Sequence, residues 1–174
     1  MQSDIIVQIS DAKISASPAE RIVTYSLGSC IGLCLYDYSQ KIGGMLHFQL
    51  PDSKIDSGTA ASNPFKFADT GTEVLYNKLI SLGAHPKKIK VTMAGGASMD
   101  AGPKGFDIGK RNILAIRKVL WKKGLFIDAE DVGSNGFRNM YLAIGDGTVT
   151  IKTAQSATTL LSPMAFAATA KQAG

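Results

Sequence analysis

A cysteine and a histidine on consecutive predicted strands are the side chains of this sequence best suited to nucleophilic chemistry. Cys30 stands where the turn of residues 27–29 meets a segment with the alternating pattern of a β-strand. A thiol at such a strand entrance can face a cleft in which backbone N–H groups stabilise an oxyanion. His47 lies on the next predicted strand, so a hairpin would bring its imidazole near the thiol to take up and return a proton.

Several neighbouring residues are candidates for supporting roles in such a site. Thr24 lies on the strand before the turn, and its hydroxyl can accept a hydrogen bond from the second ring nitrogen of His47 and fix the orientation of the ring. Backbone N–H groups beside the nucleophile, or in a glycine pair on the histidine strand, are candidates for the oxyanion hole and the substrate cleft. These candidates are Gly28, Ser29, Gly43 and Gly44.

Each of these residues also has an ordinary structural interpretation. A lone cysteine in a strand is more often a small buried apolar residue, and a lone histidine or threonine is usually a packing or surface residue. Cys34 falls between two leucines in mid-strand, where burial would raise its pKa, so we interpret it as structural. The Cys-x-x-x-Cys spacing disfavours a redox pair, and two cysteines with two scattered histidines are too few for a zinc site. We therefore expect neither a metal nor a cofactor.

Hydrophobic periodicity and turn residues predict the elements that carry these side chains. Capping residues and apolar stripes predict two main helices, one from Asp69 or Thr70 to about Leu82 and one between Asp107 and Gly124. We interpret residues 51–64 as a surface loop. Strands are predicted at residues 5–9, 21–26, 31–36, 41–50, 88–93, 125–132, 139–144 and 148–152.

This order of elements predicts a single α+β layered domain over residues 1–153, with mixed or antiparallel sheets. No internal repeat divides the chain. Residues 154–174 are rich in alanine, serine and threonine, a composition that predicts a disordered or loosely helical tail.

Composition and charge exclude several classes of protein. With 45% hydrophobic and 19% charged residues, the chain has the balance of a globular domain. No apolar run approaches the roughly 20 residues of a membrane span, and no basic segment precedes an apolar stretch at the N-terminus, so we expect a cytoplasmic protein without direct membrane insertion. The net charge of +5 favours acidic partners, but aromatic residues do not interleave with the lysine clusters, so we expect no nucleic-acid binding.

Five sequence blocks occur in an order that is itself informative. Residues 27–37 read Leu-Gly-Ser-Cys-Ile-Gly-Leu-Cys-Leu-Tyr-Asp, and residues 43–51 read Gly-Gly-Met-Leu-His-Phe-Gln-Leu-Pro. Further blocks follow at residues 67–70, 94–99 and 108–112. Together they resemble the chemoreceptor glutamine deamidase family CheD, with the first block similar to its nucleophile motif and the second to its histidine motif. The resemblance covers residues 21–153, and its specificity lies in the order of the blocks.

The resemblance implies that Thr24, Cys30 and His47 are catalytic. It implies an enzyme of bacterial or archaeal chemotaxis that converts glutamine side chains of methyl-accepting chemoreceptors to glutamate through a cysteine thioester. It also implies the layered fold of cytotoxic necrotizing factor catalytic domains and a regulatory partner, a CheC-type phosphatase. One position departs from the family pattern, because Phe137 separates Gly136 from Arg138 where the family has a Gly-Arg pair. This departure changes the surface near that turn.

The residues alone leave two other functions open. A non-catalytic adaptor that binds chemoreceptors or CheC would use the same surface without turnover. A cysteine hydrolase acting on another amide or on an ester would use the same thiol, imidazole and oxyanion hole. The choice of a receptor substrate therefore rests on the resemblance.

Overall fold

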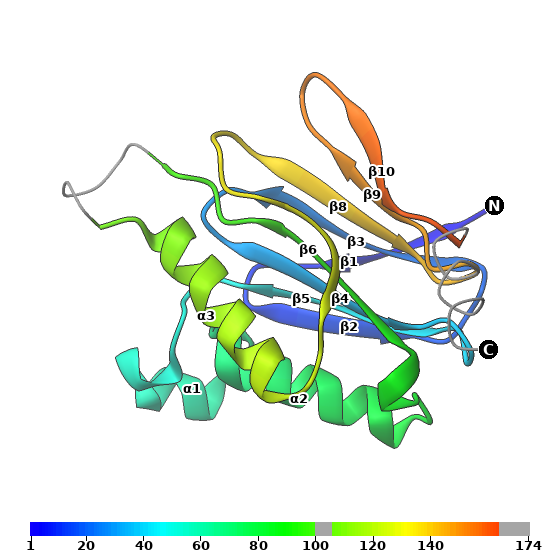
Figure 1. Cartoon of the computed structure of the whole chain (residues 1–174), viewed down its shortest axis with the longest axis horizontal. Coiled ribbons are helices and arrows are strands. Elements are labelled where there is room, and N and C mark those ends of the chain that lie inside the picture. The colour runs from blue at the N-terminus through cyan, green and yellow to red at the C-terminus, as the bar shows by residue number, and fades with distance from the viewer. Residues whose placement is uncertain (100–105, 164–174) are drawn as a thin grey trace.

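The computed structural model describes residues 1–99 and 106–163, which form two stacked five-stranded sheets with helices on one side (Figure 1). The outer sheet has the strand order β1 (Ser3–Val7), β3 (Glu20–Leu27), β8 (Arg138–Ala143), β9 (Val149–Lys152) and β10 (Ala157–Leu161). The middle sheet has the order β2 (Asp11–Ser15), β5 (Ile42–Phe48), β4 (Ile31–Asp37), β6 (Ile89–Gly95) and β7 (Ile127–Val132). Because the β1–β3 and β6–β7 pairs are parallel and the other pairs antiparallel, both sheets are mixed.

Helices cover the face of the middle sheet that is turned away from the outer sheet (Figure 1). The long helices are α2 (Ala68–Ser81) and α3 (Ile108–Lys122), and the short α1 (Ser57–Ser62) lies beside them. The Asp107 side chain caps α3 by accepting a hydrogen bond from the Lys110 N–H at 3.0 Å. Short 3₁₀ turns occupy Ser53–Ile55, Pro64–Lys66 and Pro86–Lys88.

The middle sheet is buried on both faces, which explains why its central strands are largely apolar. Every residue of β4 and β5 is buried. On β4, Leu33 and Leu35 pack against the helices, while Cys34 and Tyr36 face the outer sheet. Alternate side chains of residues 31–36 therefore face two different hydrophobic cores, and neither set faces solvent.

The predicted α+β class, the mixed sheets and the two main helices are confirmed, but three elements were missed. Strand β2 carries Asp11 and Lys13 and pairs with one neighbour, β5, so it has little apolar signal. Residues 57–62, predicted as loop, form α1, which buries none of its residues. Residues 157–161, predicted as disordered or loosely helical tail, instead form β10 and pair with β9. The rest of that predicted tail, residues 164–174, lies outside the described residues.

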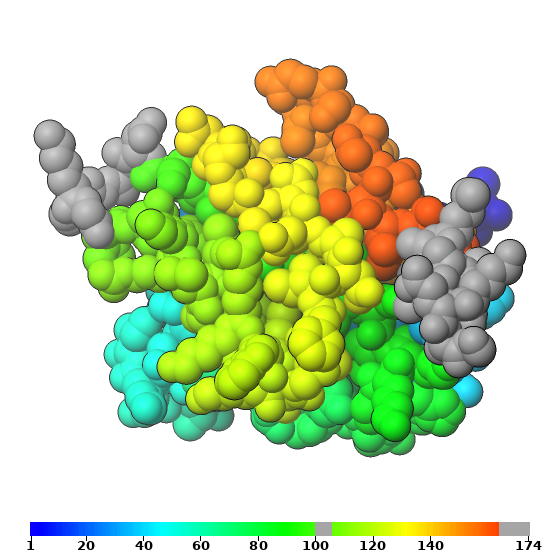
Figure 2. Space-filling view, in the orientation of Figure 1, coloured from blue at the N-terminus to red at the C-terminus, as the bar shows by residue number. Residues whose placement is uncertain are grey.

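The surface of the molecule follows these layers. Figure 2 shows the β9–β10 hairpin, in orange, projecting from a face on which α3 and β7 lie in yellow-green and yellow. Among the helices of the described residues, none combines the length and the apolar composition that a bilayer crossing requires.

Candidate active site

A buried hydrogen bond joins the two sheets at the predicted histidine. His47 on β5 is 1% exposed, and its Nδ1 lies 2.8 Å from Oγ1 of the fully buried Thr24 on β3. The Thr24 hydroxyl donates to the carbonyl oxygen of Val7 at 2.9 Å, so it accepts from the imidazole. His47 therefore carries its proton on Nδ1 and keeps the lone pair on Nε2, as a general base requires.

A bulge in β3 takes the chain from this hydrogen bond to the nucleophile turn. The β3–β8 register shifts between Thr24 and Leu27, and Ser26 in the bulge has a φ of 56°. The Ser26 N–H donates to Oδ1 of Asn139 at 2.9 Å and not to a backbone carbonyl. Bulges bend a strand and increase its twist. After this bend the chain crosses to β4 of the middle sheet through the turn that carries Cys30.

Cys30 is half-buried just before β4, on the face of the middle sheet that His47 also occupies. Gly32 pairs directly with His47, so Cys30, two residues earlier on the same face, is a diagonal neighbour of His47. Diagonal neighbours have Cα atoms about 7–8 Å apart, which is within reach of long side chains. Cys30 also packs against the core between the sheets, which places the thiol on the side of the imidazole. The structure thus brings Thr24, Cys30 and His47 together at one end of the gap between the sheets.

Burial favours the neutral forms of both reactive groups. It lowers the pKa of His47 from 6.5 to about 4, because a buried imidazolium loses its hydration. Burial also raises the pKa of the Cys30 thiol, and the nearby backbone N–H of Cys30 offsets part of this effect. In the resting state the thiol and the imidazole are therefore both neutral.

Comparison with known proteins decides the family. A family model described as CheD chemotactic sensory transduction matches residues 49–153. A probable chemoreceptor glutamine deamidase CheD of Solibacter usitatus (strain Ellin6076) is 47% identical over 143 residues, which cover 82% of this chain and 85% of that protein. The probable chemoreceptor glutamine deamidase CheD 1 of Syntrophus aciditrophicus (strain SB) is 45% identical over 149 residues, covering 86% and 93%. The chain belongs to the CheD family.

The second cysteine of this CheD family chain lies in an inert environment. Cys34 is 1% exposed, and its sulfur contacts the sulfur of Met140 at 3.9 Å. Burial raises the pKa of Cys34 to about 12. The structural interpretation of Cys34 agrees with this placement.

Iodoacetamide at pH 8 is expected to alkylate Cys30 and to leave Cys34 unmodified in the folded chain. A thiol with a pKa of about 12 is ionised to only about 10⁻⁴ at this pH, and reagent cannot reach a sealed sulfur. Peptide mass mapping after short exposures measures both rates, and labelling in denaturant, where the two thiols react alike, is the control. Faster modification of Cys34 in the folded chain would contradict the assignment.

Two of the candidate cleft residues, Gly28 and Ser29, form the turn before Cys30. A Cβ added to Gly28 would lie 3.0 Å from Cε1 of Phe137 and 3.4 Å from the sulfur of Met99. Both of these side chains are largely exposed. We call them the apolar rim (Met99 and Phe137), and they lie over the turn that carries the nucleophile. The residue that departs from the family pattern is thus beside the candidate site.

The other two candidates, Gly43 and Gly44, serve packing and do not line the cleft. Gly43 precedes His47 by about 13 Å along the strand, given a rise of about 3.3 Å per residue. A Cβ at Gly43 would lie 2.8 Å from the ring of Tyr36, and one at Gly44 would lie 2.6 Å from Leu75 on α2. The glycine pair therefore gives room to side chains from both cores, which corrects its predicted place in the cleft.

Asn112 on α3 is the site residue that the pattern of the sequence does not reveal. It is fully buried, and its side-chain amide donates to the carbonyl oxygens of Ser29 at 2.9 Å and Gln49 at 2.8 Å. Its one signal in the sequence is a polar residue on the buried side of an amphipathic helix, within the block of residues 108–112. Such a signal indicates a buried hydrogen bond but does not identify the partner.

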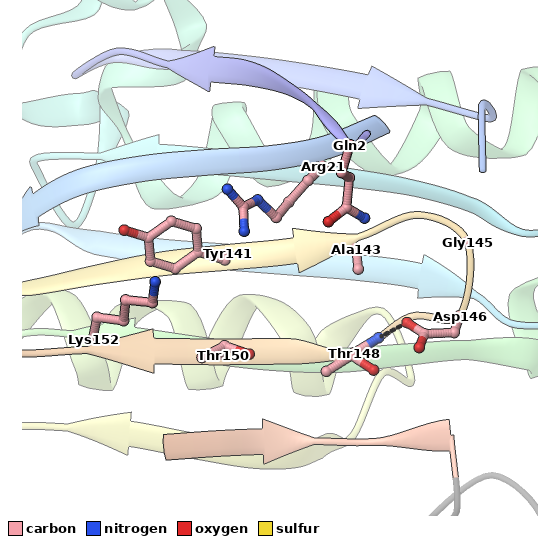
Figure 3. A pocket seen from close by; sticks show the side chains of 9 residues that line it. All are labelled: Gln2, Arg21, Tyr141, Ala143, Gly145, Asp146, Thr148, Thr150 and Lys152. Atoms are coloured by element: carbon pink, nitrogen blue, oxygen red, sulfur yellow. Dashed lines mark hydrogen bonds between the residues drawn. The ribbon is translucent and has the colours of Figure 1, made fainter. Parts of the chain in front are cut away.

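A hollow of about 440 Å³ on the exposed face of the outer sheet is separate from this site (Figure 3). Arg21 and Lys152 lie over the ring of Tyr141 there, 4.9 Å and 4.8 Å from its centroid. The alternate residues of the same strands, including Ile22 and Met140, face the core between the sheets. The outer sheet therefore stands between this hollow and the buried imidazole.

Proposed function

We propose that this chain is a protein-glutamine deamidase of chemoreceptors, the activity that the names of its relatives give to those proteins. The observation that carries the proposal is the hydrogen bond from His47 Nδ1 to Thr24, because it leaves Nε2 as a base on the face that Cys30 shares. This Nε2 is buried and has no hydrogen-bond partner among the described residues. Its lone pair is therefore not used by another group of the described residues and can accept a proton.

Formation of a thioester is the first half of the proposed reaction. Cys30 Sγ attacks the side-chain amide carbon of a receptor glutamine while His47 Nε2 takes up the thiol proton. The tetrahedral intermediate then collapses as the imidazolium returns this proton to the amide nitrogen, which leaves as ammonia. A low pKa suits both steps, because the imidazole is neutral when it must accept the proton and strongly acidic when it must release it.

Hydrolysis of the thioester completes the reaction. His47 Nε2 accepts a proton from a water molecule, whose oxygen attacks the thioester carbon. Collapse of this second intermediate breaks the C–S bond, and the imidazolium protonates the departing sulfur. The products are a glutamate side chain and the original thiol. Thr24 holds the imidazole in one tautomer and orientation throughout.

The negative charge of both intermediates requires hydrogen-bond donors near Cys30. The N–H of Cys30 lies beside its own sulfur, the atom that bonds to the substrate carbon. We assign this N–H, with that of Ser29 beside it, to the oxyanion hole. One such donor is typically worth about 10²–10³ in rate.

The apolar rim fits the proposed substrate. A helix with its side chains is about 10–12 Å thick, so the enzyme must reach a glutamine on a broad, convex surface. Met99 and Phe137 are 42% and 58% exposed beside the nucleophile turn, where they can contact apolar side chains of such a helix. Because Gly28 has no side chain, it leaves room for the substrate glutamine to pass between the apolar rim and Cys30.

Incubation with the cytoplasmic fragment of a chemoreceptor is expected to convert specific glutamines to glutamate with release of ammonia. Intact-peptide mass spectrometry resolves the exchange of NH₂ for OH and locates the modified residues, while an ammonia assay gives the rate. The same fragment with each modified glutamine replaced by asparagine is the matched control, because the shorter side chain should not reach Cys30. Binding of the fragment without conversion would favour a non-catalytic adaptor, and hydrolysis of small esters alone would favour another cysteine hydrolase.

Three finer features belong to the same proposal. A CheC-type phosphatase would regulate the enzyme by competing with receptors for the surface around Cys30. The two sheets with helices on one side support a likeness to the catalytic domains of cytotoxic necrotizing factors. Chemoreceptor signalling domains lie inside the cell, so the proposed substrate implies a cytoplasmic enzyme.

A further inference from the structure

The nucleophile turn is held by its carbonyl groups, and one of the donors is a side chain. Three consecutive carbonyl oxygens of the turn accept hydrogen bonds, two from the segment that follows β6 and one from α3. Gly28 accepts from the N–H of Ala97 at 2.8 Å, Ser29 from the Asn112 side chain at 2.9 Å, and Cys30 from the N–H of Gly96 at 2.9 Å. The middle bond is the one that a substitution can remove.

The direction of a carbonyl fixes the direction of the N–H that follows it. In a planar trans peptide unit the C=O and the N–H point to opposite sides. Asn112 holds the carbonyl of Ser29 toward α3, so the N–H of Cys30 in the same peptide unit points away from α3. This N–H also lies beside the Cys30 thiol and offsets part of the effect of burial on the pKa of the thiol.

The amide of Asn112 also connects the two halves of the site. Its second hydrogen bond is to the carbonyl of Gln49, at the end of the segment that carries His47. One NH₂ group thus ties the residue before the nucleophile to the residue two positions after the base. Because both neighbours are carbonyl oxygens, only the NH₂ end of the amide can face them.

Two observations indicate that this amide is more than a packing element. Its Oδ1 is buried without a hydrogen-bond partner among the described residues, which a residue chosen for stability alone would avoid. Gly109 also lets α3 approach the backbone of residues 96–97, since a Cβ there would lie 2.3 Å from the carbonyl oxygen of Ala97. The helix is therefore brought close enough for Asn112 to reach the turn.

We propose that Asn112 is a positioning residue that orients the Ser29–Cys30 peptide, so that the N–H of Cys30 faces the oxyanion, and that keeps the nucleophile turn in register with the His47 strand. The inference rests on the proposed deamidase function. It predicts a defect in transition-state stabilisation, and not in binding or in exposure of the thiol.

Asn112→Leu, which keeps the approximate size of the side chain and removes both donors, tests this role. We expect kcat for receptor-glutamine deamidation to fall by about 10²-fold, the loss typical of one misdirected oxyanion donor, with KM unchanged. Alkylation of Cys30 by iodoacetamide should stay within about threefold of wild type, because displacement of iodide develops no oxyanion. Asn77→Leu on α2, an exposed asparagine in a helix, is the matched control and should keep wild-type kcat.

The outcomes separate this inference from the proposed function. Wild-type kcat in Asn112→Leu, or a parallel loss of alkylation and deamidation, would overturn the positioning role while leaving the deamidase intact. A wild-type chain that does not deamidate receptors would remove the function and the inference together. If circular dichroism shows that Asn112→Leu does not fold, Asn112→Ser takes its place. The serine side chain is shorter than that of asparagine, so Asn112→Ser should still lower kcat without raising KM. A rise in KM as large as the fall in kcat would overturn the proposal.

Discussion

Cys30→Ala is expected to abolish ammonia release from the chemoreceptor fragment. Removal of the sulfur leaves no atom to form the thioester, and loss of a catalytic nucleophile typically lowers kcat by about 10⁶-fold. The substitution removes a half-buried thiol at the edge of the core, so the fold should persist. The measurement is the rate of ammonia release at saturating fragment, together with the mass of the fragment after extended incubation.

Cys34→Ala is the matched control for this experiment. It makes the same chemical change four positions along the chain, on a sulfur that is sealed in the core and whose pKa is raised to about 12. It should lower stability slightly through a small cavity and keep turnover. Turnover by Cys30→Ala at a rate close to wild type would end the nucleophile assignment. If only Cys34→Ala lost turnover, Cys34 and not Cys30 would be the nucleophile.

His47→Gln is expected to lower kcat by about 10²–10⁴-fold, the range typical of general acid–base catalysis. Glutamine can still donate a hydrogen bond toward Thr24, but its amide nitrogen is not basic and cannot receive the thiol proton. His85→Gln is the control, because His85 is the other histidine of the chain and is exposed. Equal rates for both variants would show that the buried imidazole does not take part in proton transfer.

The pH profile of the wild-type enzyme gives an independent check on His47. Only the neutral imidazole can accept a proton, and its pKa of about 4 keeps it neutral as the pH falls from 7 to 5. An imidazole with the ordinary pKa of about 6.5 would be about 97% protonated at pH 5. We therefore expect kcat/KM to hold at pH 5 and to fall near pH 4, with the alkaline limb above pH 9 because burial raises the pKa of Cys30. An acid limb near pH 6.5 would contradict the buried environment.

Stability must be followed across the same range, because the shift in the pKa of His47 also acts on folding. The unfolded chain takes up a proton at His47 near pH 6.5, and the folded chain does so near pH 4. The group therefore contributes stability above pH 6.5 that is lost as the pH falls toward 4, by roughly 3 kcal/mol in total. Circular dichroism at each pH separates loss of turnover from loss of the fold.

The local part of this site follows from sequence pattern, because consecutive strands joined by a short turn pair as hairpins. That rule places Cys30 and His47 on neighbouring strands, and the structure has Gly32 opposite His47 as the hairpin requires. Pattern alone does not show that Thr24 belongs to the other sheet, since sheet membership depends on long-range pairing with β8. From the residues alone Thr24 is one candidate partner of the histidine beside its ordinary interpretation as a strand threonine, and the family resemblance favours the partnership.

The remaining errors have physical causes of the same kind. The polar strand β2 and the alanine- and threonine-rich β10 lack the apolar alternation of central strands, because each pairs with a single neighbour. The hydrogen bonds of Asn112 span 83 and 63 positions, and no local pattern identifies such partners. Paired glycines signal a close approach, but the approaching groups at Gly43 and Gly44 are core side chains and not a substrate.

The hydrogen bond between Thr24 and His47 makes catalysis depend on contact between the two sheets, whose facing surfaces pack largely through apolar side chains. If the two sheets separated locally while each kept the hydrogen bonds between its own strands, the imidazole of His47 would lose its hydrogen bond to Thr24. The thiol and the imidazole would still lie on one hairpin. Openings of this kind require less free energy than complete unfolding. A regulator that separated the two sheets would therefore inactivate the enzyme without contacting the nucleophile. One that stabilised the contact between the sheets would activate it in the same indirect way.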